Sequence, residues 1–261
     1  MNTKLPIMSE LQAQNKQPEY LYWVGCAGAF DDRYQKVARA FTRILNHLGT
    51  DYAVLGKEET CNGDPARRAG NEMLFYIQAS MVVETFERYE VKKIITTCPH
   101  CYNTFKNEYP DVGWSGEVIH HSQFLNNLIE EGKLKVPAGI FNGSRVVFHD
   151  PCYLGRANGE YEAPRRVIDA LKTERVEMPR NKSFALCCGA GGAQMFKEAE
   201  TGNKEIYAER TEEALGTGAS VIATACPFCM TMLTDGIKYQ NREEDVKNLD
   251  IAEMIANALG L

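Results

Sequence analysis

The sequence predicts an α/β protein of two tandem, homologous βαβ-type lobes, each with a parallel sheet and related by a pseudo-twofold duplication. Two observations predict it: short apolar runs alternate with amphipathic segments, and the spacing of the cysteines repeats. Cys26 lies 35 positions before Cys61, and Cys152 lies 35 positions before Cys187. Each pair is followed by a Cys-Pro-x-Cys motif, and the whole pattern recurs with an offset of about 126 residues.

In the first half, apolar runs and amphipathic stretches follow one another in the order of βαβ units. Asp32–Leu48 has apolar residues at helical spacing and stops at Gly49, a residue typical of helix ends. Asp64 followed by Pro65 predicts the capped start of a long helix, because proline is favoured in the first helical turn. The predicted strands are 20–25, 52–55 and 93–97, and the predicted helices are 32–48, 64–89, 99–110 and 121–131.

The second half runs in parallel with the first. Gly132–Gly143 is rich in glycine and contains Pro137, which makes it the best boundary between the halves. The predicted strands are 145–149, 175–178 and 220–225, and the predicted helices are 163–171, 204–215, 227–238 and 250–259. The predicted division is a polar N-terminal tail at 1–18, a first Cys-rich lobe at 19–137 and a second at 138–261. The cysteines follow the strands, where parallel sheets bind ligands.

Charge and composition exclude several classes of protein. The 261 residues carry a net charge of -6 and show no basic stripe, which argues against nucleic-acid binding. No apolar run is long enough to span a membrane, and residues 1–17 lack the apolar centre of a secretory signal. We therefore expect a cytoplasmic protein that is not inserted in a membrane and that reaches the inner membrane only through a partner. In such a reducing compartment, nine cysteines indicate metal binding or catalysis rather than disulfides.

Phe184–Gly192 carries the most unusual motif, two adjacent cysteines followed by glycines that permit a sharp turn. The second lobe therefore offers five thiols, whereas the first has Asn62 at the matching position and offers four. If a helix starts at the proline of each Cys-Pro-x-Cys motif, both thiols lie at its N-terminus, where the dipole favours thiolate. Four thiolates suit zinc or a cubane [4Fe–4S] cluster, and the spacing of the cysteines alone does not distinguish between the two. Five thiols exceed what one zinc or one cubane needs, so either one of them is free and reactive or a single cluster uses all five, and we favour the second.

The second half resembles the cysteine-rich CCG domain family, whose pattern is a cysteine, then Cys-Cys-Gly some thirty-odd residues later, then Cys-x-x-Cys. Members include the B-type subunit of heterodisulfide reductase, lactate-utilisation protein A, and the iron–sulfur subunits of glycolate oxidase and anaerobic glycerol-3-phosphate dehydrogenase. The resemblance covers nearly the whole chain and departs from the pattern at Asn62. It implies a noncubane [4Fe–4S] cluster in the second lobe, with five ligands: Cys152, Cys187, Cys188, Cys226 and Cys229.

For the first lobe, the resemblance leaves a cubane [4Fe–4S] cluster, zinc or an empty site, with four candidate ligands: Cys26, Cys61, Cys98 and Cys101. The expected function is an iron–sulfur oxidoreductase subunit of a heterodisulfide-reductase-like complex, used for disulfide reduction or for flavin- or quinone-linked electron transfer. The expected partners are a ferredoxin-type iron–sulfur subunit, a flavoprotein or a quinone-linked membrane subunit. The alternatives are the iron–sulfur subunit of a lactate or 2-hydroxy-acid oxidation system, and a zinc-stabilised scaffold.

Three further residues are candidates for supporting the second-lobe cluster without ligating it. His149 could donate a hydrogen bond to a cluster sulfur or be an ordinary structural histidine. Arg156 could offset the negative charge of the cluster or lie on the surface. Gly189 belongs to the glycine-rich stretch that leaves room for a bulky cluster. His100, between the two thiols of its motif, is expected to face solvent.

Overall fold

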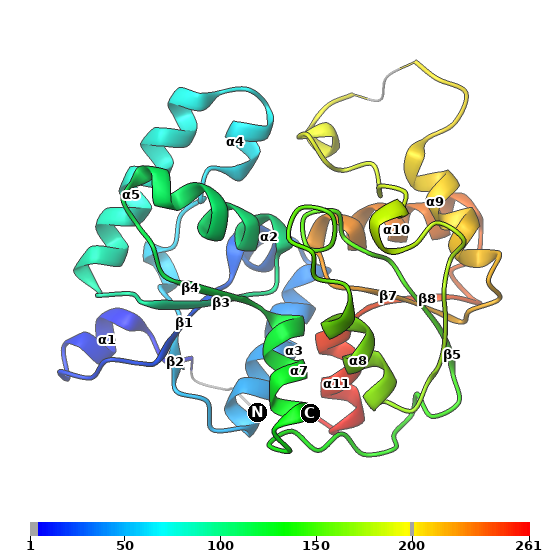
Figure 1. Ribbon diagram of the computed structural model, residues 1–261, viewed down its shortest axis with the longest axis horizontal. Coiled ribbons are helices and arrows are strands. Elements are labelled where there is room, and N and C mark those ends of the chain that lie inside the picture. Colours follow the sequence, from blue (N-terminus) through cyan, green and yellow to red (C-terminus); the bar gives the residue numbers. More distant parts are fainter. Residues whose placement is uncertain (1–4, 199–200) are drawn as a thin grey trace.

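The computed structural model describes residues 5–198 and 201–261 and contains two lobes, each built on a four-stranded parallel sheet (Figure 1). The strands are β1 Tyr20–Trp23, β2 Tyr52–Ala53, β3 Lys93–Thr96, β4 Glu117–His120, β5 Arg145–Phe148, β6 Glu174–Val176, β7 Val221–Thr224 and β8 Lys247–Asp250. The strand order is β2-β1-β3-β4 in the first lobe and β6-β5-β7-β8 in the second. Corresponding strands occupy the same positions, so the predicted α/β fold and its duplication are confirmed.

The helices cover both faces of the sheets. They are α1 Met8–Gln12, α2 Gly25–Phe30, α3 Tyr34–His47, α4 Asp64–Arg68, α5 Glu72–Arg88, α6 Pro99–Asn103, α7 His121–Glu130, α8 Glu162–Ala170, α9 Ile206–Leu215, α10 Pro227–Tyr239 and α11 Ile251–Ala258. Short 3₁₀ turns lie at Gly56–Glu58, Tyr109–Val112, Lys182–Phe184 and Gln194–Phe196, and a π-helical turn at Thr104–Glu108. Helices α3, α7, α8 and α11 pack together between the lobes (Figure 1). In the described residues, no helix is long and apolar enough to cross a membrane.

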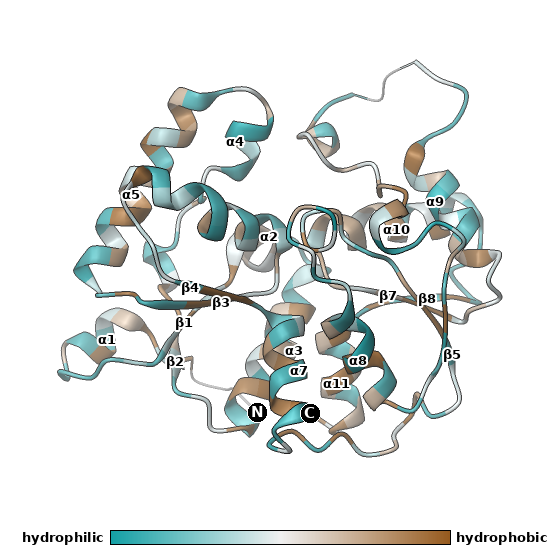
Figure 2. Ribbon diagram, viewed as in Figure 1, coloured by the Kyte–Doolittle hydropathy of each residue, from teal (hydrophilic) through white to brown (hydrophobic). Residues whose placement is uncertain are grey.

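Side chains alternate along the strands and so divide between separate cores. In β1, Leu21 and Trp23 face an outer core, where Trp23 meets Phe86 of α5 with ring centroids 5.9 Å apart. Tyr22 faces the core between the lobes and meets Phe41 of α3 at 5.2 Å. This central core takes residues from both sheets, and in Figure 2 the strands of both sheets carry much of the hydrophobic colour. The lobes therefore share one packed interior.

A buried polar contact also joins the lobes. His121 Nε2 lies 3.0 Å from Asp250 Oδ1, and both side chains are fully buried. Burial raises the pKa of Asp250 to about 7 and lowers the pKa of His121 to about 3, so His121 is neutral. Asp250 also caps α11, by accepting a hydrogen bond from the N–H of Ala252 at 2.9 Å. This contact therefore adds a polar link between the lobes to the packing of the shared core.

The single helix predicted at 64–89 is wrong, because the chain forms two helices, α4 and α5, with a break between them. Gly70 in the break has a φ of +85°, a left-handed value that glycine tolerates. Asn71 then starts α5 by accepting a hydrogen bond from the N–H of Leu74 at 3.0 Å. Asp64 is not the predicted N-cap but the first residue of α4, after Gly63. Its carboxylate is therefore available for other contacts.

Some segments give no clear signal in the sequence. Strands β4 and β8 were not predicted, because each is a four-residue outer strand with only one fully buried residue. Residues 5–18, within the predicted polar tail, pack on the first lobe: Ile7 bridges Val54, and Met8 is buried. The predicted limits of the lobes, at 19–137 and 138–261, stay a prediction.

Candidate metal sites of the two lobes

Four cysteines lie just beyond the carboxyl ends of the central strands, where parallel sheets place their ligand sites. Strands β1, β3, β5 and β7 lead respectively to Cys26, Cys98, Cys152 and Cys226. Cys98 and Cys226 are the N-caps of α6 and α10, and each helix starts at the following proline, as predicted. Equivalent strands therefore bring thiols to the same edge of each sheet.

The five thiols of the second lobe form a continuous series of contacts. The sulfurs meet in the order Cys152, Cys187, Cys188, Cys229 and Cys226. Hydrogen bonds from the thiols of Cys152 and Cys188 lower the pKa of Cys187. The backbone N–H of Gly189, 3.3 Å from the Sγ of Cys187, acts in the same direction. The structure thus brings together all five residues predicted as ligands in this lobe.

The four thiols of the first lobe also lie together: Cys26, Cys61, Cys98 and Cys101. Contact with Cys98, followed by burial, raises the pKa of Cys101. Burial raises the pKa of Cys26 to about 12, and the nearby Cys98 and Cys61 add to the rise. Gly25 has a φ of +76°, and a Cβ there would lie 3.6 Å from the Sγ of Cys101, so the backbone comes close to the thiols.

The turns that follow β2 and β6 have the same geometry. Gly63 and Gly189, which close these turns, have φ values of +90° and +96°. The N–H of each glycine lies close to the Sγ of the cysteine two residues earlier, at 3.5 Å and 3.3 Å respectively. Asn62 therefore holds the same place in the first turn, between the cysteine and the glycine, as Cys188 holds in the second.

His149 lies beside the thiols of the second lobe. One of its ring nitrogens and the Sγ atoms of Cys188 and Cys229 all lie within 4.8 Å of one another. Its Nδ1 accepts a hydrogen bond from Nε of the buried Arg210 at 3.0 Å. Burial and then the charge of Arg210 lower the pKa of His149 to about 3, so the ring is neutral. Because a guanidinium only donates, Nε2 carries the proton, and His149 can donate to sulfur but has no lone pair for a metal.

His100 is buried, so the expectation that it faces solvent is wrong. Its Nδ1 lies 2.9 Å from Asp64 Oδ2. Burial lowers the pKa of His100, but the hydrogen bond with Asp64 and the nearby thiols outweigh this effect and raise the pKa to about 9. The ring also contacts Tyr153 and Phe228, with centroids 4.3 Å and 4.7 Å away. An imidazolium and two aromatic rings therefore lie between the two groups of thiols.

The other two supporting candidates differ in their surroundings. Arg156 is exposed, and its predicted effect on the cluster stays a prediction. At Gly189 a Cβ would lie 3.4 Å from both Ile206 Cβ and Met232 Cε, an ordinary contact distance. Its φ of +96° favours glycine, so its part in the site is to shape the turn.

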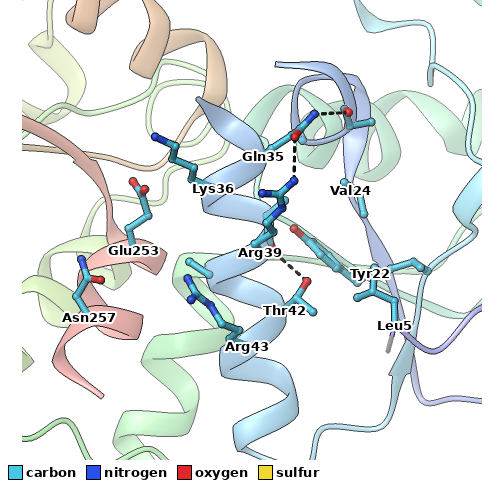
Figure 3. A pocket seen from close by; sticks show the side chains of 15 residues that line it. Leu5, Tyr22, Val24, Gln35, Lys36, Arg39, Thr42, Arg43, Glu253 and Asn257 are labelled. Atoms are coloured by element: carbon cyan, nitrogen blue, oxygen red, sulfur yellow. Dashed lines mark hydrogen bonds between the residues drawn. The ribbon is translucent and has the colours of Figure 1, made fainter. Parts of the chain in front are cut away.

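A separate cavity of about 830 Å³ lies along α3 (Figure 3). Its polar lining includes Lys36, Arg39 and Arg43 from α3 and Glu253 and Asn257 from α11. Figure 3 shows Arg39 held by Gln35, whose Oε1 accepts a hydrogen bond at 3.2 Å. No cysteine is among the residues that line this cavity. A smaller cavity is lined by three of the four cysteines of the first lobe, Cys26, Cys98 and Cys101, and also by Phe228 of the second lobe.

The donor sets fit a bound thiolate-ligated metal or cluster. All nine cysteines are free thiols, and they gather into one group of four and one of five. Thiolates this close repel one another unless a cation lies among them. Asn62 Nδ2 adds a buried N–H donor that has no partner within the described chain. This chemistry suits iron–sulfur clusters, and four thiolates also suit zinc.

Comparisons with known proteins agree with this arrangement. The chain is 45% identical to "Probable iron-sulfur-binding oxidoreductase FadF" of Bacillus subtilis, over 99% of this chain and 36% of that protein. It is 44% identical to "EtfAB:quinone oxidoreductase" of Syntrophomonas wolfei, over 95% of this chain and 35% of that protein. It is 34% identical to a subunit of the dihydromethanophenazine:CoB--CoM heterodisulfide reductase of Methanosarcina barkeri, over 93% of this chain and 59% of that protein. The chain thus spans about a third of the first two relatives.

The model of the CCG family, described as a cysteine-rich domain, matches the chain twice, at residues 20–106 and 146–234. The first match contains all four thiols of the first lobe, and the second contains all five thiols of the second lobe. Together the matches cover more than half of the sequence, and the resemblance inferred from the cysteine pattern is confirmed. The chain therefore belongs to the CCG cysteine-rich domain family.

Proposed function

We propose that this chain is the cluster-carrying part of an oxidoreductase that passes electrons between a flavoprotein and a quinone-linked partner. The observation that best supports this is the gathering of free thiols into two groups at equivalent sheet edges. Iron–sulfur clusters bound there supply one-electron redox chemistry. Relatives at 45% and 44% identity, named as an iron-sulfur-binding oxidoreductase and a quinone oxidoreductase, favour this function over a zinc scaffold.

In this proposal the second lobe holds a noncubane [4Fe–4S] cluster through its five thiols, and the first lobe holds a cubane [4Fe–4S] cluster, or zinc, through its four. His149 donates its Nε2–H toward the thiols of the second lobe, and Arg210 keeps it in that tautomer. The imidazolium of His100 lies between the lobes and offsets part of the negative charge of both groups of thiolates.

Disulfide reduction is the second candidate, because one relative is named as part of a heterodisulfide reductase. The packing at the lobe boundary favours electron transfer instead. His100 contacts Tyr153 and Phe228 there, so aromatic rings occupy the space between the two groups of thiols. We also propose a ferredoxin-type iron–sulfur subunit as a partner, and a cytoplasmic position that reaches the inner membrane through the quinone-linked partner.

The test uses the chain purified without oxygen. A reduced EtfAB-type flavoprotein should bleach the visible absorbance of the chain, and a water-soluble quinone should restore it. A small disulfide added in place of the quinone should yield no free thiol. Thiol release in proportion to the disulfide added would favour the second candidate, and a chain that the flavoprotein cannot bleach would rule out the first.

A further inference from the structure

Asn62 is buried in its turn, with its amide orientation fixed. The residue is 3% exposed. Its Oδ1 accepts a hydrogen bond from the N–H of Asp64 at 3.2 Å, and its backbone carbonyl accepts one from the hydroxyl of Tyr109 at 3.0 Å. Exchanging the amide oxygen and nitrogen would set Nδ2 against the N–H of Asp64, donor against donor. The oxygen therefore faces Asp64, and Nδ2 is the group left over.

This Nδ2 finds no hydrogen-bond acceptor in residues 5–198 and 201–261. Asn62 lines the small cavity of the first lobe together with Cys26, Cys98 and Cys101. The carboxylate on that lining, Asp64, already accepts hydrogen bonds from three other side chains. A buried donor without an acceptor is unfavourable, so a ligand that brings an acceptor is expected there. If the thiols that line this cavity hold a metal or cluster, the acceptor available to Nδ2 is a sulfur of a thiolate or of the cluster.

We propose that Asn62 Nδ2 donates a hydrogen bond to a sulfur of the group held by the first-lobe thiols. Because Asn62 stands in place of a fifth cysteine, it also limits this lobe to four thiolate ligands. The inference rests on the iron–sulfur function proposed above. Asn62 holds the position in its turn at which the second lobe has the thiol of Cys188. A hydrogen bond to sulfur stabilises the more negative, reduced form of a cluster and so raises its potential. One position therefore sets both the number of ligands and the potential of the first lobe.

Asn62→Ala removes the donor and keeps the four thiols. We expect unchanged iron content and a more negative potential of the first-lobe cluster. At the wild-type midpoint, the ratio of oxidised to reduced cluster should rise about tenfold, the effect of losing one charge-assisted hydrogen bond. An EPR-monitored redox titration of the anaerobically purified chain measures this, and the signal of the second lobe in the same sample reports an intact fold. Asn46→Ala is the matched control: the Nδ2 of Asn46 is likewise buried and unpartnered within the described residues, but its Oδ1 contacts Tyr52.

Asn62→Cys tests the second half of the inference. It should change the EPR signal of the first lobe toward that of the second, because a fifth thiol then occupies the same place in the turn. An unchanged potential in Asn62→Ala would overturn the inference and leave the proposed function standing. If the wild-type first lobe contains zinc, the cubane assignment fails by itself. Release of zinc to a chelator then decides: faster release from Asn62→Ala supports the donor, and equal rates overturn it.

Discussion

Cys188→Ser is expected to abolish or strongly distort the EPR signal of the second-lobe cluster. The thiol of Cys188 contacts those of Cys187 and Cys229 and so joins the two ends of the sulfur series. A serine hydroxyl is a harder ligand and ionises far less readily than a thiol, so it is a poor replacement on iron. The measurement is EPR of the anaerobically purified variant under the conditions that give the second-lobe signal in the wild type.

The matched control is Cys61→Ser, which makes the same chemical change in the other lobe. It should alter the signal of the first lobe and leave that of the second intact. A second-lobe signal that survives unaltered in Cys188→Ser would contradict the five-ligand assignment. Cys188 would then be a thiol that lies beside the cluster without binding it.

Arg165→Met is expected to lower the free energy of unfolding by about 3–5 kcal/mol, the usual effect of removing one partner from a buried ion pair. Arg165 is 2% exposed. Its Nη1 and Nη2 donate to the two carboxylate oxygens of Asp150 at 2.7 Å and 2.9 Å, and its Nε donates to Glu177 at 2.8 Å. Methionine fills a similar volume but leaves the carboxylate of Asp150 buried without its cation. Chemical denaturation of the anaerobically purified chain measures the loss.

The same ion pair supports the site. Asp150 also accepts a hydrogen bond from the N–H of Lys182 at 2.8 Å, and so ties the segment that leads to Cys187 beside the one that carries Cys152. Arg165→Met should therefore also lose iron faster to a chelator. The control is Arg166→Met, since the side chain of Arg166 is 57% exposed and should contribute less than about 1 kcal/mol. Equal losses in the free energy of unfolding of the two variants would show that the contacts of Arg165 stabilise the fold no more than those of Arg166.

The features that the sequence predicted correctly can be read from the spacing of residues along the chain. The equal spacing of 35 residues in each half predicted two homologous lobes, and the matching strand orders confirm them. The Cys-Pro steps predicted helices that start at Pro99 and Pro227, because proline suits the first turn whatever surrounds it. The strands of βαβ units are parallel, so their carboxyl ends all lie at one edge of the sheet. The cysteines that follow these strands therefore come to the same edge.

The residues that the sequence left unexplained act through tertiary contacts. Arg165 and Arg210 look like ordinary charges on amphipathic helices, yet they are 2% and 0% exposed because other segments cover them. The surroundings of His100 depend on Tyr153 and Phe228, which come from the other lobe. Asn62 is visible in the sequence only as a missing cysteine, and the orientation of its amide emerges only in the folded turn.

The content of iron, acid-labile sulfide and zinc in the chain purified without oxygen bears most directly on whether each lobe closes around an inorganic cluster. We predict a coloured protein with about eight iron and about eight sulfide per chain, about four of each in the first lobe and about four of each in the second. About four of each together with one zinc would restrict the cluster to the second lobe. A colourless protein that binds zinc and no iron would contradict the account.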